Sequence, residues 1–243
     1  MMTQGIYRVE YNRALAPGVW ELRLSGDTSA LTAPGQFINI KLDGFYLRRP
    51  ISVCDWDGEG ITVIYKVVGK GTAALSSVEP GQDLDILCGL GNGFDVSKCG
   101  RRTLAIGGGA GVPPMYALAK ALLAAGKTPI AILGFNKKDE VFYEDRFRAL
   151  GVETAVTTAD GSHGQKGFVT DALPETYDFY CACGPIPMLK AVYDAAPTSG
   201  LLSFEERMGC GFGACMGCTC KTKYGNKRIC KDGPVLEKEE VIW

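Results

Sequence analysis

The sequence has almost no histidine, no excess of charge of either sign and no long apolar run. Among its 243 residues, 26 lysines and arginines stand against 27 aspartates and glutamates, so the net charge is −1. Such a balance gives no excess of positive charge that would attract nucleic acid or an anionic membrane surface. We therefore expect neither nucleic acid nor a membrane as a partner.

The chain also lacks an export signal and a membrane-spanning segment. Residues 1–5 are polar and contain no apolar core of a signal peptide. The longest uncharged apolar-rich stretch, residues 103–119, is interrupted by glycines and prolines and ends before Lys120, which makes it a poor membrane span. We expect a soluble protein of the cytoplasm.

Cysteine, by contrast, is plentiful and unevenly placed. The chain has 10 cysteines, and half of them crowd together near its end, namely Cys210, Cys215, Cys218, Cys220 and Cys230. In an exported protein an even number of cysteines can indicate disulfides. Without an export signal, clustered cysteines indicate metal ligands instead.

The spacing of these cysteines is the strongest signal in the sequence. Cys210-x4-Cys215-x2-Cys218 followed by Cys230 is the spacing of plant-type [2Fe–2S] ligation. Two iron ions bridged by sulfides need four thiolates, two for each iron. Glycines at 209, 211, 213 and 217 allow the backbone to turn sharply and to direct N–H groups at the sulfurs.

A structural zinc site is the main alternative, because zinc also accepts four thiolates. Zinc sites usually combine C-x2-C with a second such pair or with histidines. Here Cys230 stands alone and the only histidine, His163, is distant in sequence. Iron–sulfur ligation is therefore favoured. We expect the thiol of Cys220 to point away from the cluster and to be buried beside it.

Changes in residue pattern and composition along the sequence predict three units: residues 1–99, 100–202 and 203–243. The first has short alternating or β-branched runs separated by turn residues, which predicts an antiparallel barrel or sandwich. Its candidate strands are residues 6–11, 19–24, 37–42, 61–68 and 83–87. The second alternates strands and helices, which predicts a parallel sheet with helices on both faces. Its candidate elements are strands 103–106, 129–134, 154–157 and 178–183 and helices 113–125, 143–150, 167–173 and 187–195. The third is rich in glycine and cysteine and needs a metal centre to hold its shape.

A flavin site is indicated by segments of the first unit. An arginine at a strand turn, as Arg49 in residues 48–53, can clamp a pyrophosphate with forked hydrogen bonds, and Ser52 can offer its hydroxyl to a ring nitrogen. Downstream, Ile64-Tyr65-Lys66 lies on the next strand. Gly71-Thr72 then opens a helix, where free N–H groups attract anions. Each piece alone could be an ordinary turn or surface residue, but their order is specific.

A nicotinamide site is indicated by two segments of the second unit. The loop Gly107-Gly108-Gly109-Ala110-Gly111 follows a strand and opens a helix, the context of a dinucleotide-binding loop, although it departs from the usual G-x-G-x-x-G. Cys183-Gly184-Pro185 ends the last long strand, where ligands of open α/β sheets bind. Lys137 and Lys138 follow another strand and can accept the 2′-phosphate of NADP, so the choice between NAD and NADP stays open.

The order of these motifs resembles the ferredoxin–NADP reductase superfamily. The tail, with Glu206 to Cys215 and Cys230 to Val235, looks like the electron-transfer subunit of type B dihydroorotate dehydrogenase, and the resemblance covers essentially the whole chain. An aliphatic residue at Ile51, where the wider superfamily often has an aromatic one, fits this narrower family.

The resemblance implies FAD in an N-terminal antiparallel β-barrel, NAD(H) in a parallel α/β domain and a [2Fe–2S] cluster in a small C-terminal domain. It further implies an FMN-containing catalytic subunit as partner, in a heterotetramer of two copies of each. Electrons would pass from FMN through the cluster and FAD to NAD+ in pyrimidine synthesis, without a catalytic acid or base on this chain. Carried over by position, the FAD residues are Arg49, Pro50, Ile51, Ser52, Ile64, Tyr65, Lys66, Gly71 and Thr72, and the iron ligands are Cys210, Cys215, Cys218 and Cys230.

Two other functions remain open from the sequence. One is the small subunit of an NADH-dependent ferredoxin–NADP oxidoreductase or sulfide dehydrogenase, which shares the three units and differs in its partner. The other is a zinc-stabilised binding module without redox activity, which would be colourless.

Overall fold

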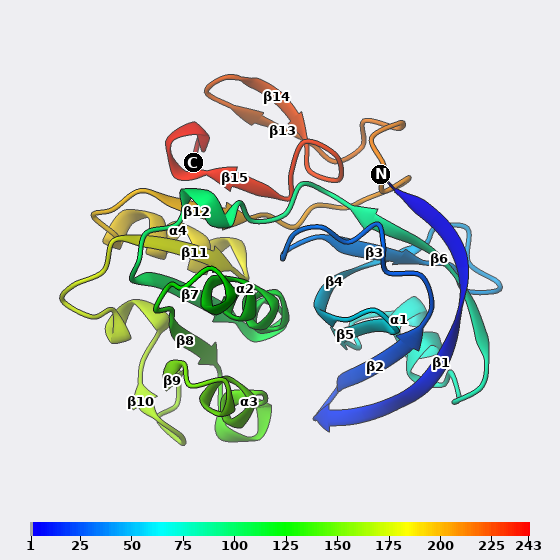
Figure 1. Cartoon of the computed structure of the whole chain (residues 1–243), viewed down its shortest axis with the longest axis horizontal. Helices are drawn as coiled ribbons and strands as arrows, with labels where there is room; N and C mark the ends of the chain where they lie inside the picture. The colour runs from blue at the N-terminus through cyan, green and yellow to red at the C-terminus, as the bar shows by residue number, and fades with distance from the viewer. Residues whose placement is uncertain (1) are drawn as a thin grey trace.

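The N-terminal part of the chain is a closed six-stranded barrel in the computed structural model, which describes residues 2–243. The strands are arranged in the order β1-β2-β5-β4-β3-β6 and all pair antiparallel (Figure 1). A short helix, α1, connects β5 to β6. Their bounds are β1 (Thr3–Ala16), β2 (Val19–Ser25), β3 (Phe37–Ile40), β4 (Arg49–Trp56), β5 (Gly60–Lys66), α1 (Lys70–Ser76) and β6 (Asp83–Leu90).

Alternation along the strands explains why they close into a barrel. Apolar side chains at every second position, such as Ile38 and Ile40 on β3 or Ile61 and Val63 on β5, are buried in one cluster inside the barrel. Because the side-chain period is two, the residues between them face the outside. The outer face of β3 and β4 thereby becomes available to the rest of the chain.

The second part is a seven-stranded sheet in the order β10-β9-β8-β7-β11-β12-β15. Strands β7 to β12 pair in parallel, and only β15 runs antiparallel to its neighbour. The strand bounds are β7 (Thr103–Gly108), β8 (Ile130–Phe135), β9 (Glu153–Thr158), β10 (Gln165–Lys166), β11 (Phe179–Cys183), β12 (Gly200–Ser203) and β15 (Val235–Glu237).

Helical segments cover both faces of this sheet. The buried side chains of α2 and α3 belong to one apolar cluster, and those of α4 belong to a second cluster on the opposite face. The bounds are η1 (Val96–Lys98), η2 (Gly109–Gly111), α2 (Val112–Ala124), η3 (Lys138–Glu140), α3 (Glu144–Ala149), η4 (Val169–Ala172), α4 (Ile186–Ala195) and η5 (Lys238–Glu240). The predicted barrel and the predicted parallel α/β sheet are both confirmed.

One predicted helix is shorter than expected. Residues 167–173 form only a 3-10 turn, Val169–Ala172, instead of an α-helix. Asp171 accepts a hydrogen bond from the backbone N–H of Phe168, which closes a single turn. Leu173 precedes a proline, and this position disfavours helical backbone, so the turn cannot continue.

The cysteine-rich tail lies across the barrel and the sheet. It contains a two-stranded hairpin, β13 (Thr219–Thr222) with β14 (Gly225–Arg228), and then adds β15 to the large sheet (Figure 1). Cys218, Ile229 and Cys230 are buried in the same apolar cluster as Phe37 of the barrel and Leu202 of the sheet. The tail is therefore packed against both larger parts. No helix within residues 2–243 has the length and apolar character needed to cross a bilayer.

A buried carboxylate joins the barrel to the part of the chain that holds the parallel sheet. Glu21 on β2 is fully buried and accepts hydrogen bonds from the Tyr143 hydroxyl (2.6 Å) and from Nε of Arg13 (2.8 Å). The pKa of Tyr143 is raised, mainly by burial and to a smaller extent by the nearby Cys54 and Glu21. Its hydroxyl therefore keeps the proton that it donates. A second link, Lys120 to Asp55 (2.5 Å), connects α2 with β4.

Replacing Tyr143 by phenylalanine is expected to lower the free energy of unfolding by about 1–3 kcal/mol, because the buried Glu21 loses a donor. Chemical denaturation followed by circular dichroism measures this change. Tyr224→Phe is the matched control: that side chain is 76% exposed, and its loss should change stability by no more than about 0.5 kcal/mol. Equal effects of the two substitutions would contradict the role of the Glu21 contact.

Candidate redox sites

The four candidate iron ligands form two pairs. Sγ of Cys210 accepts hydrogen bonds from the backbone N–H groups of Ala214 (3.2 Å) and Cys215 (3.4 Å), which places the first two cysteines together. Sγ of Cys218 accepts a hydrogen bond from the N–H of Cys230 (3.4 Å), which places the other two together. A tight loop therefore supplies one pair, and the end of the β13–β14 hairpin completes the other.

The surroundings of the thiols suit anionic sulfur. Partial burial raises the pKa of Cys210, but hydrogen bonds from the backbone of Cys215, Phe212 and Ala214 outweigh it and bring that pKa to about 6. The pKa of Cys230 is raised to about 12. Burial is the main cause, and the neighbouring thiols of Cys218 and then Cys210 add to it. The thiols thus act on one another electrostatically, and a cationic centre would relieve their repulsion.

This pairing fits a centre with two iron ions. Within residues 2–243, no three cysteine, histidine or carboxylate side chains are already arranged around a point that could hold one metal ion. Two pairs of thiols can instead supply two ligands to each of two irons. N–H groups that point at sulfur, from Ala214, Cys215 and Gly217, would stabilise the reduced cluster.

A charged clamp holds the two halves of this centre. Arg228, at the end of β14, donates from Nη1 to the carbonyl of Gly213 in the cysteine loop (3.0 Å). Its Nε donates to Asp232 (2.9 Å), and the backbone N–H of Arg228 reaches the same carboxylate (2.9 Å). The clamp spans the loop that carries Cys210 and Cys215 and the turn that carries Cys230.

Cys220 lies apart from both pairs. It is on β13, opposite Lys227 of β14, and is half-buried against the apolar cluster under the hairpin. Burial raises the pKa of its thiol, which opposes thiolate formation. That Cys220 does not bind iron stays a prediction, which a Cys220→Ser variant can test.

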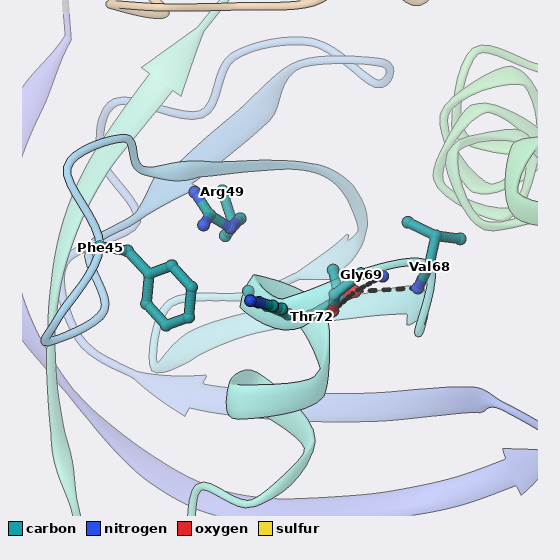
Figure 2. Close-up of a pocket in the computed structure, with 7 residues that line it drawn as sticks. Phe45, Arg49, Val68, Gly69 and Thr72 are labelled. Atoms are coloured by element: carbon teal, nitrogen blue, oxygen red, sulfur yellow. Dashed lines mark hydrogen bonds between the residues drawn. The ribbon is translucent and has the colours of Figure 1, made fainter.

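Three of the candidate flavin residues, Arg49, Gly71 and Thr72, line a pocket of about 310 Å³ on the barrel. It is lined by Phe45, Arg49, Val68, Gly69, Lys70, Gly71 and Thr72. Figure 2 shows Phe45 and Arg49 facing the Val68–Thr72 segment across this space. The guanidinium carbon of Arg49 lies 4.7 Å from the centre of the Phe45 ring, a cation–π contact. Two positive side chains, Arg49 and Lys70, therefore line the pocket, as a pyrophosphate requires.

Gly71 and Thr72 shape this pocket in different ways. A Cβ atom on Gly71 would lie only 1.8 Å from Nε of Arg49, so any larger residue would displace the guanidinium. The Thr72 hydroxyl accepts hydrogen bonds from the backbone N–H groups of Val68 (2.9 Å) and Gly69 (3.2 Å), which fixes the turn before α1. The pocket is thus built to bring the backbone close to an arginine, an arrangement that fits the phosphates of FAD.

The other candidate flavin residues divide between the two faces of the barrel wall. On β4, Pro50 and Ser52 lie opposite Asn39 and Phe37 of β3 and share the outer face with them. Ile51 lies opposite Ile38 and packs toward the barrel interior. Ile64 and Tyr65 are buried, whereas Lys66 is exposed. Tyr65 donates a hydrogen bond to Asn12 (3.0 Å) inside the barrel, so its backbone alone remains for a ligand.

The two candidate nicotinamide segments meet at the carboxyl ends of the sheet strands. Cys183, the last residue of β11, pairs with Gly107 of β7 and with Ser203 of β12. A Cβ on Gly111 would lie 2.0 Å from the carbonyl oxygen of Cys183, which shows how closely the glycine loop passes. A Cβ on Gly108 would lie 2.4 Å from Sδ of Met188.

The remaining residues of these two segments lie at the same carboxyl ends of the strands. Gly109 has a left-handed φ of 51° and Ala110 is exposed, whereas Gly184 and Pro185 lead into α4. Burial raises the pKa of Cys183 to about 12, against a smaller opposite effect of Ser203, so the group at this edge is a neutral thiol. A small uncharged side chain of this kind fits beside a nicotinamide ring.

The polar loops after β8 and β9 are tied to each other. The backbone N–H of Lys138 donates to Ser162 (2.7 Å), and Lys137 forms an ion pair with Asp139 (3.6 Å). His163 lies 2.7 Å from a carboxylate oxygen of Glu144 on α3. The only histidine is therefore the partner of a carboxylate that is itself only 13% exposed.

Sequence reasoning missed several residues near these sites. Phe45, Val68 and Lys70 line the flavin pocket, yet nothing in the local pattern separates Phe45 from an ordinary loop aromatic. Asn39 sits in an alternating strand, where a polar residue indicates a solvent-facing position, but only 1% of it is exposed. Its amide donates to the carbonyl of Cys210 (3.3 Å), a contact across 171 positions that no pattern signals.

The barrel, the sheet with its glycine loop and the paired thiols together define a class of protein. It is a nicotinamide-dependent flavin reductase that carries its own iron–sulfur domain. A family model described as the iron–sulfur cluster binding domain of dihydroorotate dehydrogenase B matches residues 205–242. A second model, described as an oxidoreductase NAD-binding domain, matches residues 105–194.

Comparisons over the full length give the family. The chain is 45% identical over 257 aligned positions, covering 100% of both chains, to the electron transfer subunit of dihydroorotate dehydrogenase B (NAD+) from Geobacillus sp. strain WCH70. It is 44% identical to the subunit of the same name from Fusobacterium nucleatum, over 96% of each chain. A solved structure of an NADH-dependent reduced ferredoxin–NADP oxidoreductase aligns with a TM-score of 0.89 and 31% identity, covering 98% of this chain and 90% of that one.

The chain belongs to the family of dihydroorotate dehydrogenase B (NAD+) electron transfer subunits. It is an oxidoreductase component, and its cofactors are FAD, a [2Fe–2S] cluster and NAD(H). The alternative of a zinc-stabilised module without redox activity does not agree with the iron–sulfur model over residues 205–242. Because these relatives are named as subunits, the family has a catalytic partner.

Proposed function

We propose that this chain takes electrons from the catalytic subunit of a dihydroorotate dehydrogenase B and delivers them to NAD+ in pyrimidine synthesis. One observation carries the proposal. The loop that bears Cys210 contacts β3 of the barrel, and β3 pairs directly with β4, which bears Arg49 to Ser52. The loop that carries an iron ligand therefore contacts the strand next to the one that carries Arg49 to Ser52.

The residues of the chain have binding and positioning roles in this function. Cys210 and Cys215 hold one iron, and Cys218 and Cys230 hold the other. Arg49 to Ser52, Ile64 to Lys66 and Gly71-Thr72 bind FAD. Gly107 to Gly111 and Cys183 to Pro185 bind the nicotinamide nucleotide beside the sheet edge. When bound, FAD exchanges hydride with nicotinamide and single electrons with the cluster, so no side chain has to act as an acid or base.

The proposal extends to the partner and to the organisation of the chain. The partner is an FMN-containing subunit that oxidises dihydroorotate, assembled with this chain as two copies of each. The units are residues 1–99 for FAD, 100–202 for NAD and 203–243 for the cluster. A cytoplasmic location is supported by the six cysteines outside the cluster, which form no disulfides, since free thiols persist in a reducing compartment.

Purification of the chain with its native partners tests this function. We expect one FAD, two irons and two sulfides per chain and an FMN protein as partner, and the complex should reduce NAD+ when dihydroorotate is added. The similarity to an NADH-dependent ferredoxin–NADP oxidoreductase, at 31% identity, supports a second candidate, the small subunit of such an enzyme. Recovery of a partner that reduces NADP+ with ferredoxin and does not oxidise dihydroorotate would favour that candidate.

A further inference from the structure

The cysteine loop rests on one polar side chain of the barrel. Asn39, on β3, is 1% exposed and donates from Nδ2 to the backbone carbonyl of Cys210 (3.3 Å). Gly211 follows with a left-handed φ of 82°, and a Cβ at that position would lie 2.4 Å from Nδ2 of Asn39. The backbone of the loop is therefore seated directly on the amide, and only glycine permits this approach.

The same side chain lies on the face of the barrel that carries Pro50 and Ser52 of the flavin motif. Asn39 is directly opposite Pro50 in the β3–β4 register, and Ser52 is two positions further along β4. Residues paired in this way point to the same side of a sheet, with Cβ atoms about 4.5–5.5 Å apart. Arg48 fixes this part of β3, because its Nη1 donates to the carbonyl of Asn39 (3.4 Å) while Nη2 pairs with Asp85 (2.9 Å).

One half of the Asn39 amide has no partner within the chain. Its Oδ1 is buried and accepts no hydrogen bond from residues 2–243. Turning the amide over would not help, because Oδ1 would then face the carbonyl oxygen of Cys210. An unpaired buried acceptor costs about 1–3 kcal/mol, and a donor from a bound molecule or an ordered water would remove that cost.

We propose that Asn39 is a positioning residue that holds the Cys210 loop against the flavin-binding face of the barrel and thereby sets the rate of electron exchange between cluster and flavin. This inference rests on the proposed function. The amide nitrogen fixes the backbone of an iron ligand, and the unpaired amide oxygen belongs to a side chain on the face that β3 shares with Pro50 and Ser52. Asn39 itself exchanges no electrons and no protons.

Asn39→Leu tests the proposal, since leucine has a similar size and neither polar atom. In the purified chain with FAD and cluster bound, NADH should still reduce the flavin at the wild-type rate. Transfer from reduced flavin to cluster, followed by freeze-quench EPR, should slow by about 10-fold to 100-fold, as for a small misplacement of reacting groups. The reduction potential of the cluster should become more negative, because the positive end of the amide dipole no longer faces the loop.

Gln36→Leu is the matched control. Gln36 is another buried amide of the barrel, 5% exposed, whose Nε2 donates to the Gly91 carbonyl (3.1 Å) and whose Oε1 accepts from the Thr32 N–H (2.7 Å), and neither partner lies in the cysteine-rich tail. It should leave the cluster potential and the transfer rate unchanged. Wild-type transfer in Asn39→Leu with full cofactor content, or equal slowing in both variants, would overturn the positioning role. Absence of cluster or of NADH-reducible flavin in the wild type would instead contradict the proposed function.

Discussion

Replacing Cys215 by serine is expected to abolish the cluster and to lower electron transfer to the partner by more than about 100-fold, because even residues behind a metal ligand are worth 10–100-fold in metal affinity. Reduction of FAD by NADH should persist, since the flavin pocket lies on the barrel and none of its lining residues is a cysteine of the tail. Iron analysis, the visible spectrum and stopped-flow reduction by NADH measure the three effects separately.

Cys220→Ser is the control for that substitution. Cys220 lies on the same small unit but is paired with neither half of the centre, so the variant should keep two irons and wild-type transfer. If Cys215→Ser still passed electrons from NADH to the partner, the cluster would not lie on the route. If Cys220→Ser lost its iron, the assignment of the four ligands would be wrong.

Substitution of Gly71 by alanine is expected to release FAD. The added Cβ would lie 1.8 Å from Nε of Arg49, so the guanidinium or the turn before α1 must move. A charge-assisted hydrogen bond contributes about 1.5–3 kcal/mol, and its loss together with overpacking weakens binding on the order of 100-fold. FAD content after dialysis and titration of the apoprotein with FAD measure the change.

Gly58→Ala is the matched control for the pocket. Gly58 lies in a turn outside the flavin pocket, and a Cβ there would have no neighbour within 4 Å. The variant should bind FAD as the wild type does. Retention of full FAD affinity in Gly71→Ala would show that Gly71 and Arg49 do not form the phosphate cradle.

The architecture was largely predictable because its signals are local. Strands such as residues 61–68 carry β-branched runs bounded by turns, and the glycine loop sits between a strand and a helix in sequence. Both patterns depend on neighbours within a few residues, as element formation does. The helix predicted over residues 167–173 was wrong, because Pro174 and a hydrogen bond to Asp171 limit this segment to a single turn.

The details of the sites were less accessible because they depend on distant contacts. Cysteine spacing predicts a cluster, since three ligands lie on one loop, but it does not reveal which barrel residue supports that loop. Asn39 reads as a solvent-facing position in an alternating strand, and its burial arises from residues 210 and 211 folding back onto it. Likewise Phe45 joins the flavin pocket through a cation–π contact with Arg49 that spacing cannot show.

Strand β15 makes the large sheet depend on the iron centre. It follows soon after Cys230 and occupies the outer border of the nucleotide sheet by pairing with β12. If the cysteine-rich unit unravels when its metal is lost, as small metal-dependent folds do, β12 is left with unpaired backbone groups. Iron starvation or oxidative damage would then expose an edge strand as well as stop electron transfer. The protein without its cluster would therefore tend to self-associate before the cluster is inserted.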